Sequence, residues 1–84
     1  MNADYIYAIF DTCKQEDLPD LTIALAHLQA SCPIPDGMTE QQINQFLGRH
    51  YDALVEAYRT GDVDTFRATV AACDRDDSTN EVEA

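Results

Sequence analysis

Apolar residues recur along most of the chain at spacings of three, four and seven, which places them on one face of an α-helix. The pattern is clearest between Thr39 and Gly61, where Thr39 and Gln42 match a capping box at the start of a helix. Gly61 readily adopts the positive φ with which helices often end. We therefore predict one long third helix over residues 40–60. Its apolar stripe consists of Ile43, Phe46, Leu47, Leu54, Val55 and Tyr58.

Gly48 lies in the middle of this predicted helix. A glycine in a helix interior costs about 1 kcal/mol relative to alanine. We therefore expect close packing of another helix at Gly48, or a slight bend. A break into two helices at this point is the competing prediction.

Three shorter helices are predicted to pack against the long one, and each follows a residue suited to be an N-cap. Asn2 precedes the first helix, Asp17 the second and Asp62 the last. Pro19 falls in the first turn of the second helix, where its missing N–H costs little. The predicted spans are residues 3–15, 18–31 and 63–73.

The last segment, residues 74–84, has a different composition. It carries five acidic residues against one arginine and almost nothing apolar, so it has no means of burying itself. We predict an all-α protein: a small four-helix bundle with a long third helix, followed by a disordered acidic C-terminal tail. Residues 1–73 form the single domain, as expected for a chain of 84 residues.

The net charge of the chain limits the kinds of partner that it is expected to bind. Sixteen acidic residues against five basic ones give a net charge of −11 and a pI near 4.1. Such a field repels nucleic-acid phosphates and anionic lipid headgroups, and the basic residues are scattered instead of forming a patch. No apolar run approaches the roughly 20 residues of a membrane span. We expect no direct nucleic-acid binding and no membrane association, and a protein partner with a basic surface.

The residues that could carry chemistry are few. Cys13, Cys32 and Cys73 each fall on the apolar stripe of a predicted helix, which is typical of buried thiols. Their odd number and the absence of a signal-peptide-like start favour a reducing cytoplasm. No Cys and His spacing matches a zinc site, and His50 lies on an apolar helix face, where a core or boundary residue is expected. We predict no catalytic, cofactor-binding or metal site, and no enzymatic activity.

A surface at the first two helices is the remaining candidate. Acidic residues crowd it, and Tyr7 is expected to stay exposed and to serve as an aromatic anchor. The alternative is a solvated face whose carboxylates favour the positive ends of the helix dipoles. The candidate partner-binding residues are Asp4, Tyr7, Asp11, Glu16, Asp17 and Asp20.

Several positions also carry a family resemblance. They are Asp4-Tyr5-Ile6 at the start of the first helix, Cys13 near its end, and Thr39-Glu40, Ile43, Phe46, Leu54 and Glu56 in the third. Through these residues the chain resembles, over roughly residues 4–58, the Hha/YmoA family of small nucleoid-associated regulators. The resemblance implies binding to the oligomerisation domain of an H-NS-like silencing protein, without reading of DNA. The chain is more acidic than the family and has Tyr51 where the family has an acidic residue, so no partner-contact residue is carried over.

Two functions remain open after this reading. The first is a non-enzymatic regulatory or inhibitory protein that binds one protein partner, such as a nucleoid or transcription factor, through its acidic and partly aromatic surface. The second is a nucleic-acid mimic, whose carboxylates occupy the DNA- or RNA-binding groove of a partner. Mimicry predicts salt-sensitive binding that nucleic acid competes away. The sequence also leaves a homodimer open.

Overall fold

The computed structural model describes the backbone of residues 1–83 and the side chains of residues 1–76. Its regular secondary structure consists of helices, without a strand, which confirms the all-α class. Five helices replace the predicted four. They are α1 (Ala3–Gln15), α2 (Leu21–Gln29), α3 (Glu40–Arg49), α4 (Tyr51–Arg59) and α5 (Val63–Glu83).

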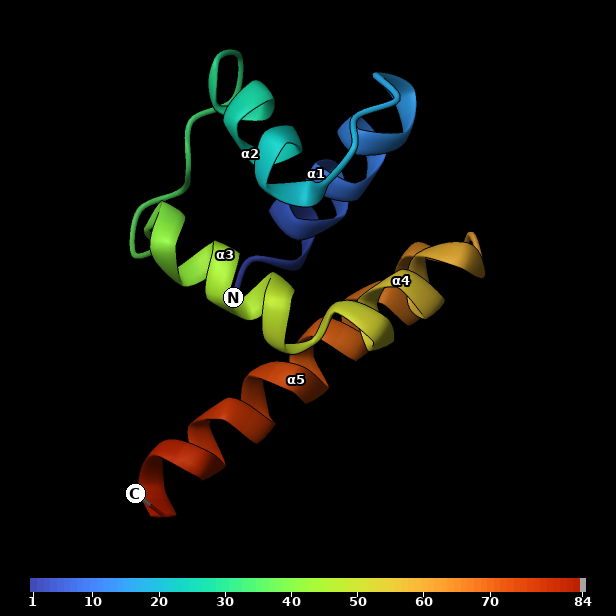
Figure 1. The fold of residues 1–84 in the computed structure, drawn as a ribbon. Coiled ribbons are helices and arrows are strands. Elements are labelled where there is room, and N and C mark those ends of the chain that lie inside the picture. The colour runs from blue at the N-terminus through green and yellow to red at the C-terminus, as the bar shows by residue number, and fades with distance from the viewer. Residues whose placement is uncertain (84) are drawn as a thin grey trace.

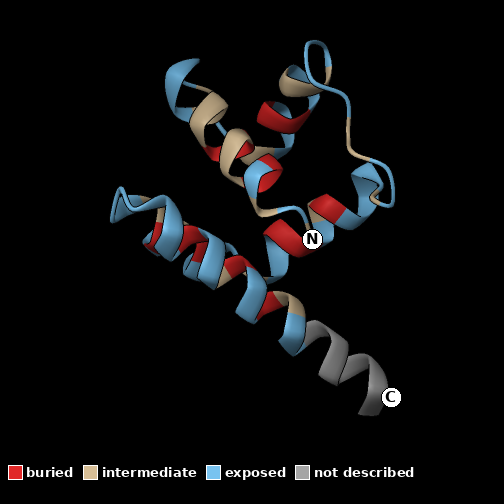
Figure 2. Ribbon diagram, turned by 180° about the vertical axis from the view of Figure 1, so that it is seen from behind, coloured by how far each residue is buried: buried red, intermediate tan, exposed pale blue. Residues whose placement is uncertain are grey.

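Helix α1 is central, because it packs against α2 on one side and against α5 on another. Helices α4 and α5 form a hairpin, and α3 joins it to α2 (Figure 1). The buried residues lie where these helices face one another (Figure 2). The buried apolar residues are Tyr5, Ile6, Ile9, Phe10, Ala24, Leu25, Ile43, Phe46, Leu47, Leu54, Ala57, Phe66, Val70 and Cys73. All five helices therefore contribute to one core, and each large buried side chain stabilises it by about 1.5–3 kcal/mol.

Three of the predicted helix boundaries are confirmed. The Asn2 side chain accepts a hydrogen bond from the backbone N–H of Tyr5 at 3.0 Å and caps α1. Thr39 and Gln42 form the capping box of α3, with reciprocal hydrogen bonds of 3.1 and 3.0 Å. Gly61 follows α4 with a φ of 74°. These local signals operate as predicted because each satisfies backbone groups that a helix end leaves unpaired.

The prediction of one helix over residues 40–60 is corrected. His50 has φ −116° and ψ 22°, outside the helical region, so α3 ends and α4 begins there. The Gly48 environment also differs from the expected close packing, because a Cβ at this position would meet nothing within 4 Å. The break lies two residues beyond Gly48. The helix before it, α3, packs against α2, and the helix after it, α4, packs against α5.

The start of the second helix is also corrected. Asp20, not Asp17, is the N-cap, and its carboxylate accepts the backbone N–H of Ile23 at 3.0 Å. Asp17 instead ends α1 with a φ of 52°. The N–H of Leu18 bonds to the carbonyl of Cys13 at 2.9 Å, and the Asp17 N–H bonds to the next carbonyl along, at 3.3 Å. This pair of bonds is a Schellman motif with Asp17 at the position that usually holds glycine.

The predicted end of the last helix at residue 73 is likewise corrected. The backbone of α5 continues as helix through Glu83, so the predicted disordered tail over residues 74–84 is not confirmed. Residue 84 lies outside the described residues. Within the described side chains, Cys73 is buried and the Asp74 carboxylate contacts the amino group of Met1. The burial of Cys73 and the contact of Asp74 with Met1 show that α5 packs against the rest of the chain beyond the predicted end of the helix.

Candidate functional site

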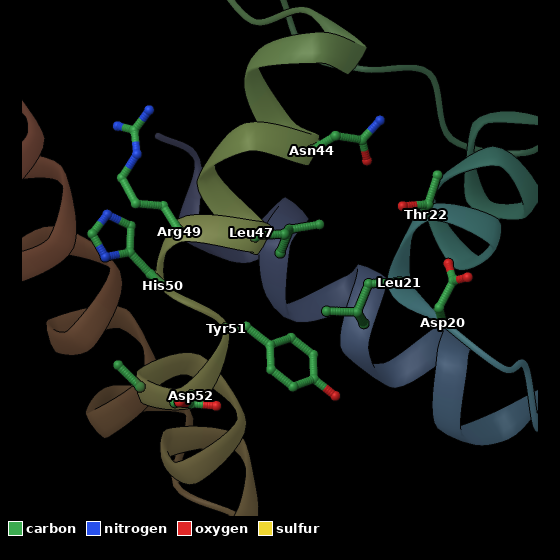
Figure 3. Close-up of a pocket in the computed structure, with 11 residues that line it drawn as sticks. Asp20, Leu21, Thr22, Asn44, Leu47, Arg49, His50, Tyr51 and Asp52 are labelled. Atoms are coloured by element: carbon green, nitrogen blue, oxygen red, sulfur yellow. The ribbon is translucent and has the colours of Figure 1, made fainter.

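An open cavity of 740 Å³ lies between the start of α2 and the junction of α3 with α4. Its wall at the α2 side is formed by Asp20, Leu21 and Thr22. The opposite wall comes from both sides of the break at His50. The residues of that wall are Asn44, Leu47, Gly48, Arg49, His50, Tyr51, Asp52 and Ala53. In Figure 3 the side chains of Leu21 and Leu47 point toward each other across the space.

A second cavity, of 530 Å³, adjoins the first. It lies between the end of α1, the α1–α2 turn and α4, and it shares Asp20, Leu21 and Tyr51 with the larger cavity. We call the two together the Tyr51 groove. The Tyr51 ring projects into the gap between α4 and α2, and the residue is 51% exposed (Figure 3). A large aromatic side chain is therefore presented to solvent between two hollows.

One polar atom in the wall lacks a partner. The Oδ1 atom of Asn44 is buried and accepts no hydrogen bond. Leaving such an acceptor unsatisfied costs about 1–3 kcal/mol. Asn44 lies on α3 and faces Thr22 of α2 across the upper end of the cavity (Figure 3).

The walls of the groove contain more acidic than basic side chains. Three carboxylates line it, from Asp17, Asp20 and Asp52. Of the two bases in its walls, Arg49 directs its guanidinium away from the cavity (Figure 3). The Lys14 ammonium lies 5.9 Å from the centre of the Tyr58 ring, in a cation–π contact. Acidic side chains therefore outnumber Lys14 and Arg49 in the walls of the groove.

Three of the six predicted partner-binding residues also make side-chain contacts within the chain. Asp4 pairs with Arg67 of α5 at 2.9 Å. Tyr7, which was expected to stay exposed, is half-buried against Tyr58 and Phe66, with ring centres 5.3 and 5.2 Å away. That expectation was wrong because the α4–α5 hairpin covers this side of α1.

Asp11 is the third predicted residue that makes contacts within the chain. Its carboxylate accepts the hydroxyl of Tyr58 at 3.2 Å and the side-chain amide of Gln15 at 2.9 Å. Burial, followed by the nearby Asp11 carboxylate, raises the pKa of Tyr58 to about 12. The phenol is therefore protonated at neutral pH and acts as a structural hydrogen-bond donor.

The other three predicted residues lie at the α1–α2 turn. Glu16 is exposed and lies 3.9 Å from the imidazole of His27. Asp17 and Asp20 line the groove. Glu16, Asp17 and Asp20 thus all lie at the surface of the turn.

The cysteines differ from one another in burial. Cys73 is buried as predicted, and Cys13 is half-buried, with its thiol donating to the Leu18 carbonyl at 3.3 Å. Cys32 is exposed, which corrects its placement in the core. The cause is that α2 ends at Gln29, so Cys32 lies beyond the apolar stripe of the helix. Burial, together with the carboxylates of the α1–α2 turn, raises the pKa of Cys13, which disfavours its nucleophilic thiolate form.

Among the side chains of residues 1–76, no three His, Cys, Asp or Glu residues gather as metal ligands would. The described helices include none with the length and apolar character needed to cross a membrane.

Comparisons with protein-family models, with curated proteins and with solved structures found no match to this chain. The resemblance to the Hha/YmoA family stays a prediction. Sequence reasoning missed Tyr51 and Asn44 as surface features of interest. A signal for Tyr51 did exist, because the competing prediction of a break near Gly48 places this residue near the start of a new helix.

Proposed function

We propose that this chain is a small non-enzymatic regulatory or inhibitory protein of the cytoplasm, which binds one protein partner with a basic surface. The observation that supports this proposal most directly is the Tyr51 groove. It presents an aromatic side chain that is 51% exposed between two cavities, with Asp17, Asp20 and Asp52 in their walls.

Aromatic and acidic side chains contribute to protein interfaces in different ways. Tyrosine supplies a large contact area with few rotatable bonds and a hydroxyl for hydrogen bonding, and it is enriched among the residues that dominate binding energies. Carboxylates around such an anchor steer a basic partner and fix its orientation, more than they add affinity. The groove combines both features, and Glu16 extends the acidic rim along the turn.

Gene regulation, or inhibition of a host factor, is the setting that we propose. A nucleoid or transcription factor presents basic surfaces, and the resemblance of residues 4–58 to Hha/YmoA proteins points the same way. In this proposal the chain does not contact nucleic acid itself, because its net charge of −11 repels phosphate.

Nucleic-acid mimicry is the alternative. It is favoured by the fact that no charged side chain is buried within residues 1–76, so these carboxylates lie at the surface. A mimic would use many of them at once, whereas the Tyr51 groove uses a local set. A single substitution in the Tyr51 groove should therefore weaken binding strongly under the first proposal and only slightly under mimicry.

The test is affinity capture from native cytoplasm with the full chain, eluted by a salt gradient and repeated with double-stranded DNA as competitor. We expect Tyr51→Ala to lower the recovery of a specific partner at least tenfold, and Asp20→Asn, which keeps a side chain suited to cap α2, to lower its elution salt. Matched controls are Val63→Ala, an exposed apolar residue outside the groove, and Asp36→Asn in the α2–α3 connection.

Capture that Tyr51→Ala leaves unchanged would contradict the groove as the binding site. Release by DNA, with equal sensitivity to Asp20→Asn and Asp36→Asn, would favour mimicry instead.

A further inference from the structure

We propose that Asp36 is a site of spontaneous covalent modification, at which the folded chain converts aspartate to isoaspartate through a cyclic imide with Gly37. The reaction needs no enzyme or cofactor, and water is the co-reactant. Its product has one additional backbone atom in the connection between α2 and α3.

The chemistry follows from the Asp36-Gly37 pair, the single Asp-Gly sequence in the chain. In the first step, the Gly37 backbone nitrogen attacks Cγ of the protonated Asp36 carboxyl group. The nitrogen loses its hydrogen and the hydroxyl leaves, so that one water is released and a succinimide forms. In the second step, one water adds to the imide. Opening of the Cγ–N bond restores aspartate, whereas opening of the bond from the nitrogen to the Asp36 main-chain carbonyl carbon gives isoaspartate, with no net change in mass.

Both reacting groups are accessible to each other and to water. Asp36 and Gly37 are exposed, in the irregular connection between α2 and α3. Gly37 has no Cβ that could shield its nitrogen, and even an added Cβ would meet nothing within 4 Å. By contrast, a leucine follows both Asp17 and Asp20. The Asp-Gly pair therefore combines an open surface with the least hindered nucleophile.

Few hydrogen bonds hold this turn. The N–H of Met38 donates to the carbonyl of Pro35 at 3.3 Å, which is long for a backbone hydrogen bond. Among the described residues, neither the Asp36 side chain nor the Gly37 N–H takes part in a hydrogen bond or an ion pair. Gly37 has a φ of 90°, and glycine adopts negative φ about as readily, so no side chain opposes rotation at this residue. The approach of the nitrogen to the carboxyl group therefore breaks no hydrogen bond of either group.

The position of the pair gives the modification a structural effect. Met38 follows directly, packs against the core, and accepts the backbone N–H of Asn2, the N-cap of α1, on its sulfur at 3.4 Å. Thr39, the next residue, begins the capping box of α3. An additional backbone atom at residue 36 displaces both residues relative to α2. We therefore expect the isoaspartate form to be less stable than the original chain.

The test is incubation of the freshly purified full chain for several weeks at neutral pH and physiological temperature, with an unincubated sample as the baseline. Trypsin releases residues 15–49 as one peptide, which contains Asp36 together with Asp17 and Asp20. Electron-transfer fragmentation cleaves the Cα–Cβ bond of isoaspartate and so identifies the converted position. We expect isoaspartate at Asp36, with a minor species lighter by one water, and at least tenfold less conversion at Asp17 and Asp20, where leucine hinders the attacking nitrogen.

Two variants and one change of conditions make the test specific. Asp36→Glu keeps the negative charge but requires a larger ring, so it should show no conversion. Asp36→Asn should convert faster, with release of ammonia, and is therefore used freshly prepared in the capture experiment. A parallel sample in urea tests the role of the folded structure. Conversion in urea but not in the folded protein would overturn the proposal, as would equal conversion at Asp17 and Asp20.

The structural effect is measured on the isoaspartate form after its separation by chromatography. Thermal unfolding should give a melting temperature a few degrees below that of the fresh chain. Equal melting temperatures would overturn the proposed effect on the α2–α3 connection.

Discussion

The hydroxyl of Tyr58 donates a hydrogen bond to Asp11 Oδ1 at 3.2 Å and so connects α4 to α1. The Tyr58 ring also stacks on Phe10 of α1, with the ring centres 5.6 Å apart. This one side chain joins the α4–α5 hairpin to the central helix through both polar and aromatic contacts.

We predict that Tyr58→Phe lowers the free energy of unfolding by about 1 kcal/mol. The ring contacts are kept, but the hydrogen bond to the Asp11 carboxylate is lost. Urea unfolding followed by circular dichroism measures the change. Tyr51→Phe is the control: it removes a hydroxyl from an exposed ring and should leave stability within about 0.5 kcal/mol. Equal losses in both variants would contradict a structural role for the Tyr58 hydroxyl.

Alkaline pH should destabilise the protein through the same residue. Tyr58 has a pKa of about 12 in the folded protein, above the ordinary value of 10.0 that it regains on unfolding. Its contribution to stability is therefore fully present below pH 10 and is lost as the pH rises to about 12. Unfolding curves collected across this interval should fall more steeply for the natural protein than for Tyr58→Phe. Parallel curves would show that other groups cause the loss.

Asp17 occupies a left-handed backbone conformation, with a φ of 52°, at the end of α1. Glycine adopts this conformation without the steric cost of a Cβ. We predict that Asp17→Gly raises the free energy of unfolding by about 0.5–1 kcal/mol. Asp17→Ala separates conformation from charge, because it removes the carboxylate while keeping the Cβ that the left-handed conformation disfavours. A gain in both variants would assign the effect to charge repulsion at the turn.

Asn44→Leu should stabilise the protein, because it removes a buried oxygen that accepts no hydrogen bond. The buried Oδ1 contributes a desolvation cost without a hydrogen bond, and an apolar side chain removes this cost. We expect a gain of about 1 kcal/mol in thermal or urea unfolding. A loss of stability would show that Asn44 has an internal role.

The sequence predicted the features of the fold that depend on neighbouring residues. The capping box of Thr39 and Gln42 and the helix end at Gly61 are local, since each satisfies backbone groups within one turn. The break at His50 is not local. It exists because α3 packs against α2 while α4 packs against α5, and the apolar stripe of residues 43–58 fits either a straight or a divided helix.

Prediction of the candidate site was limited in the same way, to features that depend on neighbouring residues. Asp17 and Asp20 were predicted because an acidic turn is visible as a run of residues. Tyr51 and Asn44 acquire their significance from the cavity, whose walls come from separate helices. Tyr7 was misplaced because a helical period identifies which residues share a face, but it does not say which other helix covers that face.

The break at His50 has a mechanical consequence for the groove. Asn44 and Leu47 lie before the break, and Tyr51 and Asp52 lie after it, yet all four line one cavity. The width of that cavity is therefore set by the angle between α3 and α4. An occupant that contacts both helices would therefore restrain this angle, and with it the orientation of the α4–α5 hairpin relative to the rest of the molecule.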